Sequence, residues 1–283
     1  MSDLTDGARP APRLIATDLD RTLLDSAGGV SPRTREALDA AASAGIHVVP
    51  ATARNPVGLR HLQPILGFDQ WALCSNGAFG VHLTTRELLF SDEVPAEVIA
   101  RFVTVLDAAV PGVRYAAVRE GGERFVAQDG YADLATFSDH KRDPSTMHGE
   151  TLDVVTGESA LKLVFRHETL GSPDLYAITR GLADSGELDS GQFEMTLSGA
   201  PFVEVMAAGV SKASGLAQLC TRLGVDRSEV LAFGDGLNDR EMLAWAGHGV
   251  AVANAEDVVK DVADELTTSN DDDGVARIIE SLL

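Results

Sequence analysis

Four short apolar runs along the chain predict buried β-strands. Each run is followed directly by polar side chains. Continuous apolar runs of this length are typical of strands that are covered on both faces of a sheet. The runs span residues 14–16, 46–50, 71–74 and 230–233, and two further short strands are predicted at 248–252 and 265–268.

Helical signals alternate with these apolar runs. Ser31 is a predicted N-cap, Pro32 takes the first helical position, and Gly45 ends the helix. Further helices are predicted over 57–66, over 212–223 with Ser211 as N-cap, and over 274–283 with Asp273 as N-cap. Because strands and helices alternate, we expect an α/β domain with a Rossmann-like parallel sheet covered by helices on both faces.

The middle of the chain has a different pattern. From about 82 to 201, strand-like stretches are separated by helical stretches near 96–109 and 173–185, and by glycine-rich turns. We therefore expect an α+β module at 82–201, inserted into a core domain formed by 13–81 and 202–283. Residues 1–12 are expected to form a flexible N-terminal tail.

The charge of the chain restricts its partners. The 283 residues carry a formal net charge of −20, so the protein should repel nucleic acid and anionic membrane surfaces. For the same reason, a phosphate site would need positive charge of its own. The N-terminus has no apolar stretch typical of a secretory signal, and no apolar run approaches the roughly 18 residues that span a bilayer. These features predict a cytoplasmic protein that binds neither nucleic acid nor membranes.

Two carboxylates directly follow the first predicted strand. Asp18 and Asp20, at positions i and i+2, suit a divided task in phosphoryl transfer. One can attack phosphorus and form an aspartyl-phosphate, and the other can protonate the leaving oxygen and later accept a proton from water. A general acid at neutral pH needs a raised pKa, and we expect the neighbouring carboxylate to raise it. The alternative is a turn with two solvated acids.

A second acidic segment follows the strand predicted at 230–233. The sequence Gly234-Asp235-Gly236-Leu237-Asn238-Asp239 places acids on a flexible loop that opens a helix. Mg²⁺ prefers oxygen ligands, and Asp18 and Asp235 can supply two of them because parallel strands end at one edge of a sheet. A turn that only caps the next helix is the alternative.

Two further polar residues are expected at the same edge. Thr52, after the second strand, offers a hydroxyl and a backbone N–H to a phosphate oxygen, unless it only caps the next helix. Lys212, at a helix N-terminus, offers a positive charge beside the positive end of the helix dipole, unless it is an ordinary surface lysine.

In combination, these segments resemble the haloacid dehalogenase (HAD) superfamily of phosphatases, in particular its Cof-type branch with a large inserted α+β cap of the C2 type. Asp18-Leu19-Asp20-Arg21-Thr22 resembles the first family motif, DxDxT, and Gly234-Asp235-Gly236-Leu237-Asn238-Asp239 resembles the fourth, GDGxND. Thr52 and Lys212 match the second and third motifs. Where the family often has TGR, this chain has Thr52-Ala53-Arg54. The resemblance covers about residues 13–283.

The resemblance implies a role for each of these residues. Asp18 would be the nucleophile and a Mg²⁺ ligand, and Asp20 the acid and base as well as a ligand through its backbone carbonyl. Asp235 would be a further Mg²⁺ ligand. The phosphate would be bound by Thr52, Lys212 and Asn238. The metal and its waters would be supported by Asp239 with Asn238, and the candidate substrate contacts are Arg54 and Asn76.

The implied activity is Mg²⁺-dependent hydrolysis of a small phosphorylated metabolite, either a sugar phosphate or a phosphorylated cofactor, by a monomer or homodimer. A phosphomutase with the same nucleophile is an alternative, since Asp20 would serve it equally well. A non-catalytic regulatory or binding protein that kept the fold is another. In the inserted module, candidate cleft residues are Lys162, Arg166, His167 and Arg124, with a solvated strand face as the alternative for each.

Overall fold

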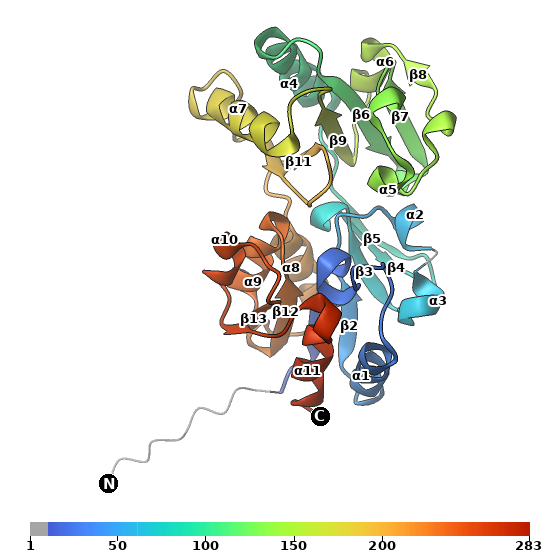
Figure 1. Ribbon diagram of the computed structural model, residues 1–283, viewed down its shortest axis with the longest axis vertical. Helices are drawn as coiled ribbons and strands as arrows, with labels where there is room; N and C mark the ends of the chain where they lie inside the picture. Colours follow the sequence, from blue (N-terminus) through green and yellow to red (C-terminus); the bar gives the residue numbers. More distant parts are fainter. Residues whose placement is uncertain (1–10, 61) are drawn as a thin grey trace.

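The computed structural model describes residues 11–60 and 62–283 and shows two domains stacked end to end (Figure 1). The lower domain in this view combines the N-terminal and C-terminal parts of the chain, and the upper domain is formed by the middle part. The predicted insertion of an α+β module into an α/β core is therefore confirmed. Of the tail predicted at 1–12, residues 1–10 lie outside the described part of the chain.

The core domain is built on a parallel sheet. In sheet order, its strands are β14 (Glu265–Leu266), β13 (His248–Ala251), β12 (Val230–Gly234), β1 (Leu14–Thr17) and β2 (His47–Pro50). Leu14 pairs with Val230 on one side and with His47 on the other, so β12, β1 and β2 begin in register. A parallel bridge between Ala51 and Leu73 adds β3 (Trp71–Cys74) beside β2. The polar residues that follow these strands are thereby brought to one edge.

Helices cover both faces of this sheet because alternate residues of a strand point to opposite faces. Ile15 packs in one apolar cluster with Leu38 and Ile279, whereas Leu14 packs in another with Leu216. The helices of the first face include α1 (Pro32–Ser43), α10 (Asp257–Lys260) and α11 (Gly274–Glu280). The second face is covered by α8 (Lys212–Leu223), and α9 (Arg240–Trp245) contributes side chains to both clusters. None of the helices within 11–60 and 62–283 is long and apolar enough to cross a membrane.

The helix caps follow the sequence prediction in part. The Ser31 hydroxyl accepts a hydrogen bond from the Thr34 backbone N–H and caps α1, as predicted. The prediction that Asp273 caps α11 is wrong, because its backbone is left-handed at φ +57° and its side chain makes no capping bond. Instead, Asp273 accepts hydrogen bonds from the hydroxyls of Ser31 and Thr34 at 2.5 and 3.0 Å, which ties the last helix to the first.

The helix predicted over 57–66 is also not continuous. The chain forms two short helices, α2 (Pro56–Leu59) and α3 (Gln63–Leu66), on either side of residue 61, which is outside the described residues. Pro64 lies in the first turn of α3, where the missing N–H is tolerated. A proline in the interior of a single helix would instead remove a backbone hydrogen bond.

The inserted cap domain is built on a six-stranded sheet that is antiparallel apart from one parallel pair at its edge. In order, its strands are β10 (Phe193–Thr196), β11 (Val203–Ala207), β9 (Lys162–Arg166), β6 (Arg114–Arg119), β7 (Arg124–Gln128) and β8 (Gly149–Glu150). The long helices α4 (Ala96–Ala109) and α7 (Ser172–Asp184) cover one face, where Phe102 packs against Phe165 and Phe193. The short helices α5 (Phe137–His140) and α6 (Leu152–Thr156) lie in the connections.

Strand pairing corrects the predicted domain boundaries at 82 and 202. β4 (Phe79–His82) and β5 (Leu88–Ser91) form an antiparallel sheet with β3 and so belong to the core. β11 pairs with β9 and β10 and so belongs to the cap. By this criterion the insertion begins after β5 and ends with β11. Short apolar strands look alike on both sides of a boundary, so their sequences do not show which sheet they join.

The turn after β3 packs closely against the start of α8. Gly77 has a φ of +89°, and a Cβ at this position would lie 2.2 Å from the Ser211 carbonyl oxygen. Gly215, one turn into α8, is equally close, since its Cβ would lie 2.8 Å from the Gly77 carbonyl oxygen. Glycine alone tolerates both the left-handed backbone and the close approach at position 77. The contact brings Lys212, the first residue of α8, next to the strand ends.

Gly77→Ala should therefore destabilise the fold more than Gly209→Ala. The two glycines have φ values of +89° and +73°, but nothing lies within 4 Å of a Cβ at Gly209. A left-handed alanine costs roughly 1–2 kcal/mol, and overpacking at Gly77 adds roughly 1–3 kcal/mol. Urea denaturation should show the larger loss in the free energy of unfolding for Gly77→Ala. Equal losses in the two variants would contradict the close packing of α8 against this turn.

Candidate active site

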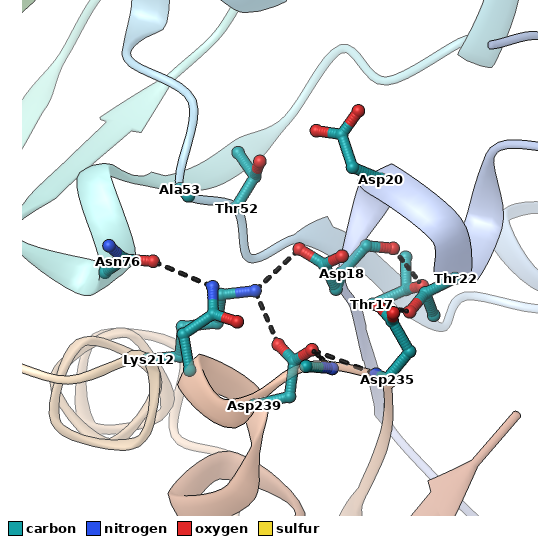
Figure 2. A network of polar contacts seen from close by, with 12 residues as sticks. Thr17, Asp18, Asp20, Thr22, Thr52, Ala53, Asn76, Lys212, Asp235 and Asp239 are labelled. Carbon is teal, nitrogen blue, oxygen red and sulfur yellow. Dashed lines mark hydrogen bonds and ion pairs between the residues drawn. The ribbon is translucent and has the colours of Figure 1, made fainter. Parts of the chain in front are cut away.

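The carboxyl edge of the core sheet collects most of the side chains that the sequence indicated (Figure 2). They come from the ends of β1, β2, β3 and β12, from the loop after β12, and from the first residue of α8. In open parallel sheets this is the edge where ligands bind. The residues brought together are Asp18, Thr52, Asn76, Lys212, Asp235, Asn238 and Asp239.

Lys212 lies at the centre of this group and is completely buried. Its Nζ donates hydrogen bonds to Asp18 Oδ1 at 2.6 Å and to Asp239 Oδ1 at 2.5 Å (Figure 2). Burial by itself would lower the pKa of Lys212, but the charges and hydrogen bonds of the two carboxylates raise it above its ordinary value. Lys212 is thus a charged residue of the site, and the alternative of an ordinary surface lysine is wrong.

Asp239 holds both Lys212 and the loop after β12. Its second carboxylate oxygen accepts hydrogen bonds from the backbone N–H groups of Asp235 and Gly236, at 2.9 and 3.0 Å. Both oxygens of Asp239 are therefore engaged by the protein itself. This arrangement suits a residue that orients Lys212 and the loop after β12 rather than one that reacts itself.

The site contains more negative than positive charge. One carboxylate oxygen from each of Asp18, Asp235 and Asp239 lies within 4.8 Å of the other two, and all three residues are buried around the single ammonium of Lys212. Burial and the neighbouring carboxylates raise the pKa of Asp18 well above its ordinary value, against the opposing charge of Lys212. Burial and the charge of Asp239 raise the pKa of Asp235 to about 6. Such a cluster fits a divalent cation, which would relieve the repulsion between the carboxylates.

Thr22 has a place in this cluster that the sequence did not assign. Its buried hydroxyl donates a hydrogen bond to Asp235 Oδ1 at 2.9 Å (Figure 2). The turn between Asp18 and Thr22 makes this possible, with Arg21 in a left-handed conformation at φ +64°. The threonine of the DxDxT segment thus joins the first acidic loop to the second.

Asp20 is the predicted site residue that does not join the cluster. Its carboxylate points away from Asp18 (Figure 2) and forms a two-pronged ion pair with Arg54, from Nε at 2.8 Å and from Nη2 at 2.6 Å. Burial by itself would raise the pKa of Asp20, but the hydrogen bonds and charge of Arg54 lower it. The expected increase in this pKa is therefore wrong for this conformation. The sequence did not reveal that Arg54 lies opposite Asp20.

Thr52 is buried at the end of β2, and its hydroxyl oxygen accepts a hydrogen bond from the Arg54 backbone N–H at 3.1 Å. Thr52 does not cap the next helix. That role belongs to Asn55, whose side chain accepts a hydrogen bond from the Gly58 N–H at the start of α2. The capping alternative for Thr52 is therefore excluded.

Asn76 lies between the core loops and the cap. Its side-chain oxygen accepts a hydrogen bond from Asn238 Nδ2 at 3.0 Å, and its own Nδ2 donates to Glu204 Oε2 at 3.2 Å. Glu204 comes from β11 of the cap and is completely buried. Glu204 was not predicted as a site residue, although a single carboxylate within the apolar stretch 202–206 is a signal that could have indicated it.

A cavity of about 320 Å³ lies between the cap and the core. Asp20 and Arg54 line it from the core, and His140, Lys162 and Phe202 line it from the cap. A smaller hollow of about 20 Å³ shares the lining residue Asp20 and reaches Asp18, Asp235 and Asn238. The two spaces together lead from the cap to the buried acids.

The four cap residues considered from the sequence differ in their positions. Lys162 lines the cavity, as expected, and pairs with Glu204. The other three do not line it: Arg166 pairs with Asp139, His167 lies near the Pro111 carbonyl, and Arg124 pairs with Glu120 and Glu158.

Comparisons with known proteins agree with this geometry. The family model for haloacid dehalogenase-like hydrolases matches residues 15–279. The chain is 30% identical over 272 residues to the 5-amino-6-(5-phospho-D-ribitylamino)uracil phosphatase YcsE of Bacillus subtilis, covering 94% of each protein. It is 29% identical over 276 residues to the pyridoxal phosphate phosphatase YbhA of Escherichia coli, covering 96% of this chain and 98% of that one.

Among solved structures, SMU.1108c from Streptococcus mutans is similar, with a TM-score of 0.81 and 25% identity. The match covers 96% of this chain and 98% of the other, so it includes both the core and the cap. Together with the family match, this places the protein among the haloacid dehalogenase-like hydrolases, in the Cof-type branch of phosphatases that carry an inserted α+β cap.

Proposed function

We propose that this protein hydrolyses a small phosphorylated metabolite, with Asp18 as the nucleophile and Mg²⁺ as the cofactor. The observation that carries the proposal is the buried Asp18 carboxylate, fixed by Lys212 at 2.6 Å and lining a hollow that adjoins the cavity under the cap. Lys212 restrains the attacking oxygen and supplies the local positive charge that a chain of net charge −20 needs at a phosphate site.

The reaction would proceed in two displacements. A carboxylate oxygen of Asp18 attacks phosphorus as the bond to the leaving oxygen breaks, and Asp20 donates a proton to that oxygen. Water then attacks the aspartyl-phosphate while Asp20 accepts a proton from it, and inorganic phosphate leaves. Lys212 and Thr52 would bind the phosphoryl oxygens during both steps.

Asp20 must first turn away from Arg54. In the structure, Arg54 keeps the Asp20 carboxylate ionised, which opposes its use as an acid. Arg54 Nη1 is buried and has no hydrogen-bond partner among the described residues. We propose that an oxygen of the bound substrate accepts a hydrogen bond from the Arg54 guanidinium. The Asp20 carboxylate would then be free to turn toward the leaving group.

The donor set is appropriate for Mg²⁺. Asp18 and Asp235 would hold the ion directly, together with the Asp20 backbone carbonyl, and Asp239 and Thr22 would support these ligands. A bound Mg²⁺ would reduce the repulsion between the acids and the incoming phosphate and polarise the phosphoryl group.

The cavity under the cap would hold the leaving group. Its volume of about 320 Å³ suits a metabolite rather than a macromolecule. The His140 ring stacks on Phe202 at 4.6 Å between centroids, and Phe125 lies 4.8 Å from His140, so this wall is aromatic. Such a wall favours a phosphorylated cofactor with a flat ring over a sugar phosphate. A screen of both classes of compound would distinguish them.

The purified protein should hydrolyse p-nitrophenyl phosphate with MgCl₂ and not with EDTA. Asp18→Asn should abolish turnover, because the amide is not a nucleophile. Asp20→Asn should lower kcat by about 10²–10⁴-fold, as expected for loss of a general acid and base. It should nearly retain Mg²⁺ binding, measured by the thermal shift on adding metal, because its proposed ligand is a backbone oxygen. No turnover of this ester or of a metabolite panel by the wild-type protein would refute the proposal.

Asp235→Asn should stabilise the metal-free protein at pH 7.5. A folded-state pKa of about 6 means that the ionised carboxylate opposes folding, by on the order of 2–3 kcal/mol relative to its ordinary pKa of 3.8. At low pH, where Asp235 is protonated in the folded and unfolded states, this penalty is absent. It develops as the pH rises from the ordinary pKa to about 6 and is fully present above that. The thermal midpoint in EDTA should therefore rise less between pH 7.5 and 5 in the variant than in the wild type.

Mg²⁺ should stabilise the wild type more than the variant. A metal-free variant that is less stable than the wild type at pH 7.5 would contradict this electrostatic account.

A further inference from the structure

A chain of buried and partly buried hydrogen bonds connects the cap sheet to the loops of the candidate active site. It begins at Lys162, whose Nζ donates both to Glu204 Oε1 and, at 2.9 Å, to the Ala53 carbonyl oxygen. The other oxygen of Glu204 accepts from Asn76 Nδ2 at 3.2 Å, and Asn76 Oδ1 accepts from Asn238 Nδ2 at 3.0 Å. We call these four side chains (Lys162, Glu204, Asn76 and Asn238) the relay.

Sheet geometry explains why the two cap residues meet. Glu204 of β11 is directly opposite Val164 of β9, so Lys162, two residues along β9, is its diagonal neighbour on the same face. Leu163 and Val205 point to the opposite face and pack in the apolar cluster beneath α4 and α7. The relay face is therefore the face of the cap sheet that meets the core.

The relay reaches three separate loops of the core. Ala53, whose carbonyl Lys162 binds, lies between Thr52 and Arg54 after β2. Asn76 lies after β3, and its backbone N–H also donates to the Thr52 carbonyl at 3.0 Å. Asn238 lies in the loop that carries Asp235 and Asp239.

The relay contains a buried ion pair, between Lys162 and Glu204, that has no part in the proposed reaction. The side chains of Lys162 and Glu204 are 8% and 1% exposed. Removing such charges from water is costly, and an apolar pair of similar volume often stabilises a fold equally well or better. Stability alone therefore does not explain an ion pair at this place. Its contacts lead instead to the loops that carry Thr52, Arg54 and Asp235.

We propose that Glu204 is a positioning residue for phosphoryl transfer, which holds the loops after β2, β3 and β12 in their working arrangement through Lys162 and Asn76. This inference rests on the function proposed above. Glu204 lines the cavity under the cap, as Lys162 does, but not the hollow at Asp18. In this proposal it influences the reacting atoms through Lys162 and Asn76. A displacement of about 1 Å in groups that act on the reacting atoms can lower the rate by 10²-fold.

The test compares Glu204→Leu with the double variant Lys162→Met/Glu204→Leu. The single variant leaves the Lys162 ammonium buried without its carboxylate, so its thermal midpoint should fall. The double variant has an apolar pair in place of the ion pair, so its thermal midpoint should recover. Turnover should not recover with it: kcat and kcat/KM for p-nitrophenyl phosphate should both stay about 10²-fold below the wild type.

Glu204→Gln provides a test that preserves shape. Glu204 accepts hydrogen bonds from both neighbours, whereas glutamine has one acceptor oxygen and would direct its NH₂ at either the Lys162 ammonium or the Asn76 amide. One link of the relay must break, and kcat should fall about tenfold. This variant decides the question if the double variant does not fold.

Arg119→Met is the matched control. Arg119 is a buried cation of the cap, 3% exposed, and its guanidinium donates to backbone carbonyls between residues 154 and 159. It lies outside the relay, so the variant should lose stability and keep the wild-type kcat.

A folded double variant with wild-type kcat would overturn the positioning role and reduce the relay to a structural ion pair. Wild-type kcat in Glu204→Gln would do the same. Failure of the proposed function is a different result, because the wild-type protein itself would then show no turnover.

Discussion

The candidate active site depends on one buried ammonium ion. Lys212 has no exposed surface, and its Nζ bridges Asp18 and Asp239 at 2.6 and 2.5 Å. A buried charge is tolerated only when its partners are close and correctly oriented. The three residues are far apart in sequence, so this condition holds only when β1, the loop after β12 and the start of α8 are all in place. The glycines at 77 and 215 allow the last of these, because they let α8 approach the turn after β3.

The same cluster prepares the site for its proposed ligands. Burial raises the pKa values of Asp18 and Asp235, and the neighbouring carboxylates, which Lys212 does not fully balance, raise them further. The cost of burying these carboxylates is what a divalent cation would reduce on binding. The cap supplies the other wall of the site, where Lys162 brings a second buried ammonium close to the loop after β2.

Much of this arrangement could be predicted from the sequence. Apolar runs ending in polar residues identified the strand ends, and the parallel order brought Asp18, Thr52 and Asp235 to one edge. Lys212 was identified from its position at the start of a helix. These predictions succeed because they depend on local sequence and on one general property of parallel sheets.

The remaining features depend on contacts between distant residues. The pairing of Arg54 with Asp20 lowers a pKa that the local sequence suggested would rise. In the sequence, Glu204 is a single polar residue within a predicted strand. Only the folded structure shows that it lies between Lys162 and Asn76. The boundary strand β5 joins the core sheet through β4, and β11 joins the cap sheet through β10 and the more distant β9; the apolar patterns of these strands do not specify which sheet they enter.

The proposed reaction requires Asp18 itself to accept the phosphoryl group. The most direct measurement is mass spectrometry of peptides from wild-type protein that has been quenched in acid during turnover of p-nitrophenyl phosphate with Mg²⁺. The peptide containing Asp18 should gain the mass of one phosphoryl group, hydroxylamine should remove it, and Asp18→Asn should show no such gain. Turnover with the phosphoryl group on another residue, or with direct transfer to water and an unmodified Asp18, would contradict the proposed reaction.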